Sequence, residues 1–178
     1  MKNIKMGQWF SKEEAKNIYP NVTFLGKVWI GTNVKIGDGV WIKANVMIGY
    51  DVWIKANVII GRNVWIEPNI KIENNVEIGD DVEIGNKVKI GNNVWIWPNV
   101  KIKNNVEIGN DVKIKDNVKI GHNVKIMADV IIRDDVTIET NVKIGNNVKI
   151  WPSVMIGDGV IIEDDVEIKA NHVVAEDV

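Results

Sequence analysis

The sequence predicts an all-β fold, a triangular parallel β-solenoid with 18 residues in each coil and about eight coils. A six-residue phrase, Val-x-Ile-x-x-Asn, repeats without insertion from Val22 to Ile168, which makes 25 units. The slot before each valine holds Asn, Asp or Gly in 22 of these units. All four prolines stand one position before that slot, in a single register. A strand and a fixed corner therefore alternate along the chain.

Within each unit, the spacing of the apolar residues predicts a strand. Val and Ile lie two positions apart, so they face one side and the residue between them faces the other. Asn, Asp and Gly tolerate a positive φ best, and Pro followed by Asn is typical of a type II turn. An identical corner that does not reverse the chain winds it into a coil, and three strands close a triangle. Each strand then pairs in parallel with the strand 18 residues away.

Residues 1–20 do not follow the repeat, so we expect an N-terminal cap with a short helix, and the β-helix itself over 21–178. Ser11 and Glu14 fit a capping box at the start of the helix, and Pro20 ends it. The open end of a β-coil exposes unpaired backbone and core, and this helix is the natural lid.

Composition excludes several classes of function. The net charge is −2, so nothing in it favours nucleic acid or an anionic membrane as a partner. There is no cysteine, which excludes disulfides and thiolate chemistry. The sequence has neither a signal-peptide pattern nor a membrane-spanning apolar run, so we expect a soluble, cytoplasmic protein.

Phrases such as Ile-Gly-Asp-Asp-Val-Glu, at 78–83, carry a resemblance to the hexapeptide repeat of left-handed parallel β-helix proteins. That family includes acyltransferases and γ-class carbonic anhydrases, and the resemblance implies a left-handed coil. It also implies a homotrimer with active sites between subunits. The chain departs from the family because no loop interrupts the coils and the C-terminal helix is absent. Regularity of this degree suggests an idealised, designed sequence.

The two histidines are the first candidates for chemistry. Gly121-His122 resembles the start of a carbonic anhydrase zinc motif, but Met127 and Asn86 stand where further ligands would be. Catalytic zinc needs three protein ligands, so we interpret His122 as a solvated corner residue. His172 stands where the acyltransferase tail usually has Ser, and it lacks an orienting carboxylate, so we expect it to cap the last coil.

Acidic corners offer a possible cation site. Asp116, Asp134 and Asp135 fall on adjacent coils at one corner, where carboxylates could bridge a hard cation. Corner aspartates also serve turn conformation and solvation, and we favour that interpretation. We therefore expect no metal and no cofactor.

Large apolar residues on the outer face predict self-association. Trp29, Met47 and Trp65 are neighbours on one face in the 18-residue register, and contiguous apolar patches usually mark contacts. The alternative is that Trp only raises β propensity. We take these three residues as the interface of a homotrimer.

The uninterrupted repeat leads us to expect a structural scaffold without enzymatic activity. One alternative is an acyltransferase-like hexapeptide protein whose site lies between subunits. Another is a rod that binds a partner through its exposed tryptophans.

Overall fold

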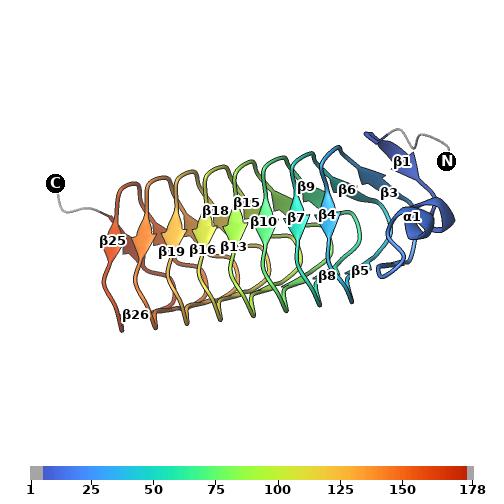
Figure 1. The fold of residues 1–178 in the computed structure, drawn as a ribbon. Helices are drawn as coiled ribbons and strands as arrows, with labels where there is room; N and C mark the ends of the chain where they lie inside the picture. The colour runs from blue at the N-terminus through green and yellow to red at the C-terminus, as the bar shows by residue number, and fades with distance from the viewer. Residues whose placement is uncertain (1–5, 176–178) are drawn as a thin grey trace.

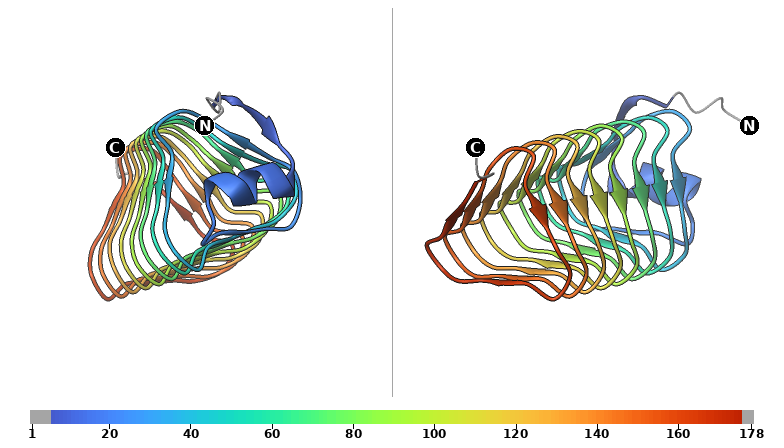
Figure 2. Two further views of the ribbon diagram at one scale, coloured as in Figure 1. Left: turned by 45° about the vertical axis from the view of Figure 1, so that its right-hand side comes forward. Right: turned by 90° about the vertical axis from the view of Figure 1, so that its left-hand side faces the viewer.

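The chain forms a straight rod of stacked coils, drawn from blue to red in Figure 1. The structure is a computed structural model that describes residues 6–175, so the ends of the two predicted parts, 1–5 and 176–178, lie outside it. Figure 2 shows the three-sided outline of the coils, with helix α1 (Lys12–Ile18) across the N-terminal end. The predicted triangular solenoid of about eight coils is confirmed.

Three sheets form the three sides, and each coil contributes one strand to each sheet. Sheet A contains, in spatial order, β1 (Gln8–Phe10), β3 (Val28–Ile30), β6 (Val46–Ile48), β9 (Trp65–Ile66), β12 (Glu83–Ile84), β15 (Lys101–Ile102), β18 (Lys119–Ile120), β21 (Thr137–Ile138), β24 (Met155–Ile156) and β27 (Val173–Val174). Sheet B contains β2 (Thr23–Phe24), β5 (Trp41–Ile42), β8 (Ile59–Ile60), β11 (Glu77–Ile78), β14 (Trp95–Ile96), β17 (Lys113–Ile114), β20 (Ile131–Ile132), β23 (Lys149–Ile150) and β26 (Glu167–Ile168). Sheet C contains β4 (Lys35–Ile36), β7 (Trp53–Ile54), β10 (Lys71–Ile72), β13 (Lys89–Ile90), β16 (Glu107–Ile108), β19 (Lys125–Ile126), β22 (Lys143–Ile144) and β25 (Ile161–Ile162).

The register between strands is the predicted one. Lys71 faces Lys89 and Ile72 faces Ile90, and the other parallel pairs repeat this 18-residue offset. Nearly every Val and Ile of the repeat is buried in one continuous core, while no polar or charged residue among 6–175 is buried. The inside of the rod is therefore uniform, and any chemistry must come from side chains on its outer surface.

The corners have the predicted left-handed backbone. From Asn33 to Asn171, every sixth residue has a positive φ, and at the non-glycine corners φ lies between 53° and 63°. Even Lys87 and Ser153 adopt it, although neither residue type favours it, because the period of the coil demands a corner there. From Gly39 onward, each corner amide also bonds to the preceding coil, as where Asn99 N–H donates to the Asp80 carbonyl over 3.2 Å. The corner therefore belongs to the hydrogen-bonded ladder between coils.

The first two expected corners differ from the rest. Neither Asn21 nor Lys27 has a positive φ. Val22 N–H instead donates to the Tyr19 carbonyl over 3.1 Å, which closes a tight turn after the N-terminal segment. The regular corner conformation therefore begins at Asn33, and the corner-to-coil hydrogen bonds begin one corner later, at Gly39.

The predicted capping box is present at the start of α1. Glu14 N–H donates to Ser11 Oγ over 3.2 Å, and Ser11 N–H donates to Glu14 Oε2 over 2.8 Å. This second bond favours the charged carboxylate and holds the pKa of Glu14 below its ordinary value. Before the helix, β1 pairs antiparallel with β3, and Phe10 and Ala15 are buried. We propose that residues 1–20 cap the first coil. The described part of this segment pairs with the edge of β3 and adds Phe10 and Ala15 to the end of the hydrophobic core.

The helix content is small. Among residues 6–175, no helix combines the length and the apolar character that crossing a membrane requires.

Replacing a corner residue is expected to cost more than replacing a face residue. Asn99 has a φ of 59°, and its side chain makes no hydrogen bond to another residue of the described range 6–175. A β-branched residue disfavours this region, so Asn99→Val should lower the free energy of unfolding by about 1–2 kcal/mol in denaturant titration. Lys101→Val should change it by less than about 0.5 kcal/mol. Asn99→Gly should stay close to the parent, and equal losses for the two valine variants would contradict the corner assignment.

Removing the N-terminal cap should cause aggregation. Deletion of residues 1–20 uncovers the edge of β3 and the apolar side chains beneath α1, including Phe24, which is 6% exposed in the intact chain. Light scattering should then report large particles, with the full chain as control. A deletion variant that remains soluble with the parent's particle size would refute the capping role.

Candidate functional site

The position after each buried isoleucine of the repeat holds either glycine or a larger side chain, and it shapes the surface of the rod. Where a larger side chain follows this isoleucine, it covers the sheet next to the corner. At several of these positions the residue is glycine, and a Cβ there would meet the next coil, as on Gly85, where it would lie 2.8 Å from the carbonyl carbon of Lys103. Four such glycines line hollows: Gly85 on sheet A, Gly79 on sheet B, and Gly91 and Gly109 on sheet C. A hollow lies at each place, of about 230 Å³ on sheet A, 500 Å³ on sheet B and 380 Å³ on sheet C. The coils therefore form sites without any inserted loop.

The hollow on sheet A contains a histidine, and we call it the histidine hollow. Six side chains supply its chemistry: Trp65, Glu67, Glu83, Lys101, Lys103 and His122. Glu83 accepts a hydrogen bond from Lys101 Nζ over 2.9 Å. Glu67, in contrast, forms no ion pair with any residue of the described range 6–175. The hollow thus combines an imidazole, an unpaired carboxylate and two ammonium groups.

A backbone hydrogen bond orients the ring of His122. Asn104 N–H donates to His122 Nδ1 over 3.3 Å. One coil earlier, the amide oxygen of Asn104 accepts the corresponding bond from Asn86 N–H over 3.0 Å. A neutral imidazole that accepts at Nδ1 carries its proton on Nε2, so His122 offers an N–H donor at that end. The predicted corner position and the neighbour Asn104 are confirmed, while the ring's place in a hollow was not predicted.

The corner aspartates also join backbone ladders. Asp116 N–H donates to Asp134 Oδ1 over 3.2 Å, and Asn117 Nδ2 donates to Asp135 Oδ1 over 3.2 Å. Across the described residues, no cluster of three His, Cys, Asp or Glu side chains could hold a metal ion. The three aspartates thus lie on neighbouring coils as expected, and two of them accept bonds from the chain itself.

His172 lies on the last coil and is exposed. Its Nδ1 is 3.3 Å from the carbonyl oxygen of Ala170, while its own carbonyl accepts from Met155 N–H over 3.0 Å. No carboxylate contacts the ring among the described residues. The two histidines therefore stand in different surroundings, and only His122 faces other functional side chains.

The three predicted interface residues lie side by side on sheet A. Trp29 faces Met47, and Met47 faces Trp65 in the parallel register. The structure adds Trp9, which faces Trp29 across the antiparallel pair of β1 and β3. Trp9 and Trp65 are 45% and 53% exposed, so the two ends of this apolar stripe (Trp9, Trp29, Met47 and Trp65) reach solvent. The stripe ends at the histidine hollow, because Trp65 belongs to both.

Ladders of amide side chains connect the corners, and the sequence analysis missed them. Asn57, Asn75, Asn93 and Asp111 form one chain of bonds between successive coils, with distances from 3.0 to 3.4 Å. The recurrence of Asn at intervals of 18 residues is the signal that could have predicted them. Corner amides in such chains hydrogen-bond one another, which glycine could not do, although both residue types tolerate the backbone.

Some of the lysines on sheet C form ion pairs with carboxylates. Lys55 and Lys71 each place Nζ 2.6 Å from a different carboxylate oxygen of Glu73, and Lys89 Nζ lies 2.7 Å from Glu107. Hydrogen bonds from Lys55 and then Lys71 lower the pKa of Glu73 below its ordinary value. Within residues 6–175, the other strand-face lysines of sheet C, Lys35, Lys125 and Lys143, form no ion pair.

Comparison with known proteins identifies the repeat. The family model described as bacterial transferase hexapeptide (six repeats) matches residues 33–64, 57–90, 87–121, 117–150 and 141–176. The chain belongs to this family. The likeness to solved structures includes the UDP-N-acetylglucosamine O-acyltransferase (LpxA) of Moraxella catarrhalis, at 21% identity and a TM-score of 0.61. It also includes the UDP-N-acetylglucosamine acyltransferase of Campylobacter jejuni, at 17% identity and a TM-score of 0.67.

These matches confirm the predicted left-handed parallel β-helix. The alignments cover 89% and 85% of this chain, but only 66% and 67% of the two acyltransferases. The chain thus spans about two thirds of the length of these structures. In the search of curated protein sequences, none matches it.

The expectation of a structural scaffold without enzymatic activity is wrong. The transferase family match and the acyltransferase neighbours favour the alternative of an acyltransferase-like protein. The expectation failed because it equated an unbroken repeat with the lack of a site. The hollows lie between side chains of successive coils, so they need no interruption of the repeat.

The ion pairs of Glu73 should stabilise the fold at neutral pH and lose this effect in acid. A folded-state pKa below the unfolded value contributes stability above the unfolded pKa, and this contribution is lost as pH falls through the folded pKa. Because the lysines are half exposed, Glu73→Gln should lower the free energy of unfolding by about 0.5 kcal/mol at pH 7. Denaturant titrations should show the difference vanishing under acid conditions. A difference that persists there would exclude the ion pairs as its cause.

Proposed function

We propose that the chain is an acyltransferase that moves an acyl group from a thioester to a hydroxyl or amine acceptor. The observation that carries the proposal is His122, which faces a hollow beside the apolar stripe in a chain of the transferase hexapeptide family. The similar bacterial structures bear the name UDP-N-acetylglucosamine acyltransferase, so this nucleotide sugar is the first acceptor to test. The regularity of the repeat still favours an idealised or designed origin.

The side chains of the histidine hollow suit each step of acyl transfer. The acceptor O–H loses its proton to the unpaired carboxylate of Glu67 while its oxygen attacks the thioester carbonyl carbon. His122 donates through Nε2–H to the oxygen that becomes negative, as neutral imidazoles do in other enzymes. The C–S bond then breaks, and the thiolate leaves with the proton from Glu67. Lys103, which is exposed at the rim, can hold an anionic group of the donor.

A homotrimer would complete the site. The stripe of Trp9, Trp29, Met47 and Trp65 offers an apolar surface for further copies of the chain, and three copies is the number that the resemblance to hexapeptide-repeat proteins implies. Because Trp65 also lines the histidine hollow, a subunit packed on the stripe would form its missing wall. Water would then be excluded from the reacting thioester.

Substitution of His122 should remove acyl transfer without unfolding the rod. Asn at this position can still accept the bond from Asn104 N–H, as Asn104 does one coil earlier. With acyl-CoA thioesters and UDP-N-acetylglucosamine, thiol release by His122→Asn should fall about 100-fold.

The matched control is His172→Asn, which changes the other histidine and should release thiol at the rate of the parent. Equal rates for the parent and His122→Asn, with all donors tested, would contradict the proposal.

The trimer should depend on sheet A. The chain has a mass of 20.0 kDa, so light scattering should give three times this value at micromolar concentration. Trp65→Lys should yield monomers, because a charge would be buried in the interface. Trp53→Lys changes a similarly exposed tryptophan, 48% against 53%, on sheet C and should leave the trimer intact. A monomeric parent chain would rule out this assembly.

A further inference from the structure

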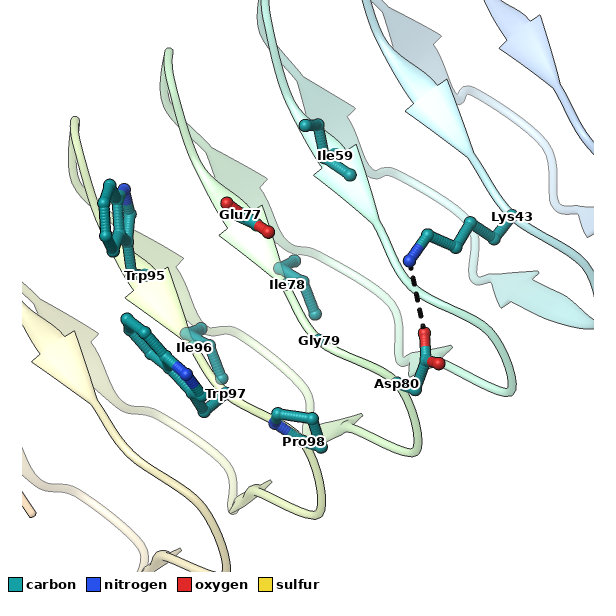
Figure 3. A pocket seen from close by; sticks show the side chains of 10 residues that line it. All are labelled: Lys43, Ile59, Glu77, Ile78, Gly79, Asp80, Trp95, Ile96, Trp97 and Pro98. Carbon is teal, nitrogen blue, oxygen red and sulfur yellow. Dashed lines mark ion pairs between the residues drawn. The ribbon is translucent and has the colours of Figure 1, made fainter. Parts of the chain in front are cut away.

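The largest of the three hollows lies on sheet B and has no part in the proposed acyl transfer. Figure 3 shows three successive coils in chain order. Ile59 lies on the first, Glu77 and Gly79 on the second, and Trp95 and Trp97 on the third. The two indoles are tilted by 47° with ring centroids 5.6 Å apart. We call this space of about 500 Å³ the tryptophan groove.

A cation from the following coil already covers each indole of the groove. Lys113 Nζ lies 5.3 Å from the centroid of Trp95, and Lys115 Nζ lies 3.6 Å from that of Trp97. Trp95 pairs with Lys113 on one side and with Glu77 on the other. The coil on the groove side therefore brings no cation to the indoles, and Gly79 leaves the place beside Trp97 open.

Glu77 faces the groove without a counter-ion. The other strand-face glutamates, Glu83, Glu107 and Glu167, each pair with a lysine at 2.7 to 2.9 Å. Within residues 6–175, Glu77 has no ion pair, and its register neighbours are Ile59 and Trp95. At the rim, Lys43 and Arg62 already neutralise Asp80 at 3.6 and 2.9 Å. The groove thus presents one uncompensated carboxylate among apolar walls.

We propose that the tryptophan groove binds a methylated ammonium group, such as the head of a choline-like ligand. The positive charge pairs with the Glu77 carboxylate, and the methyl groups contact the indoles of Trp95 and Trp97 and the side chain of Ile59. An unmethylated ammonium is strongly hydrated and fits these apolar walls less well. Lys113 and Lys115 place their ammonium groups over one side of the two indoles. The ligand cation binds on the opposite side, which faces the groove.

Calorimetric titration of the full chain with choline chloride tests the proposal. One choline should bind each chain, and the neutral isostere 3,3-dimethylbutan-1-ol should bind at least about fivefold more weakly. Glu77→Gln should weaken choline binding about fivefold, and Trp97→Leu should weaken it by at least as much. Far-UV circular dichroism confirms that each variant remains folded.

The matched control is Glu167→Gln, at the same strand position of sheet B five coils further along the chain, which should bind choline as the parent does. Equal affinity for choline and the neutral alcohol would overturn the proposal, as would unchanged binding by Glu77→Gln or no heat of binding by the parent. Because the groove lies on sheet B, these outcomes are independent of acyl transfer at His122.

Discussion

A left-handed backbone conformation at every sixth residue is the constraint on which this structure depends. It turns the chain at each side of the triangle and directs the corner N–H toward the preceding coil. Asn69 N–H, for example, donates to the Tyr50 carbonyl over 3.1 Å. Corner and strand therefore share one ladder of hydrogen bonds along the rod. The stacking of Val on Val and Ile on Ile follows, because the corner repeats without variation.

Because the corner repeats, the residues that stabilise the fold and the residues that could carry a function occupy different slots of the repeat. The interior is fixed by the repeat, and three outward slots in each unit remain free to vary. The hollows lie where glycine in one of these slots neighbours a larger side chain in the same slot of the next coil, as Gly79 neighbours Trp97 and Gly85 neighbours Lys103. Neighbouring coils then supply side chains at a spacing set by the strand ladder. In this way the rod presents the histidine hollow on sheet A and the tryptophan groove on sheet B, with the apolar stripe beside the former.

Most of the fold could be predicted from the sequence, because the repeat determines strand, corner and register together. The prolines located the corner, and Lys87 and Ser153 follow it despite their residue type. The start of the chain was less predictable, since β1 (Gln8–Phe10) has no repeat signal and pairs antiparallel. Its position depends on the edge of β3, a tertiary feature that local patterns do not encode.

The candidate site could be predicted only in part. The neighbours Trp29, Met47 and Trp65 followed from the 18-residue offset. The surroundings of His122 did not, because they depend on Gly85 leaving space between Glu67 and Lys103. The repeat pattern predicts where each side chain lies on the rod. A hollow also depends on the sizes of the side chains on neighbouring coils, which the pattern does not consider. The scaffold without enzymatic activity was predicted wrongly because the hollows on the outer surface were not foreseen.

Native-state hydrogen exchange of the corner amides tests the central claim most directly. In the middle coils, the amides of Asn69 and Asn99 should exchange as slowly as the strand amide of Lys71, because all three donate to carbonyls of adjacent coils. Corner amides that exchange as fast as those of open loops, beside protected strand amides, would contradict the account.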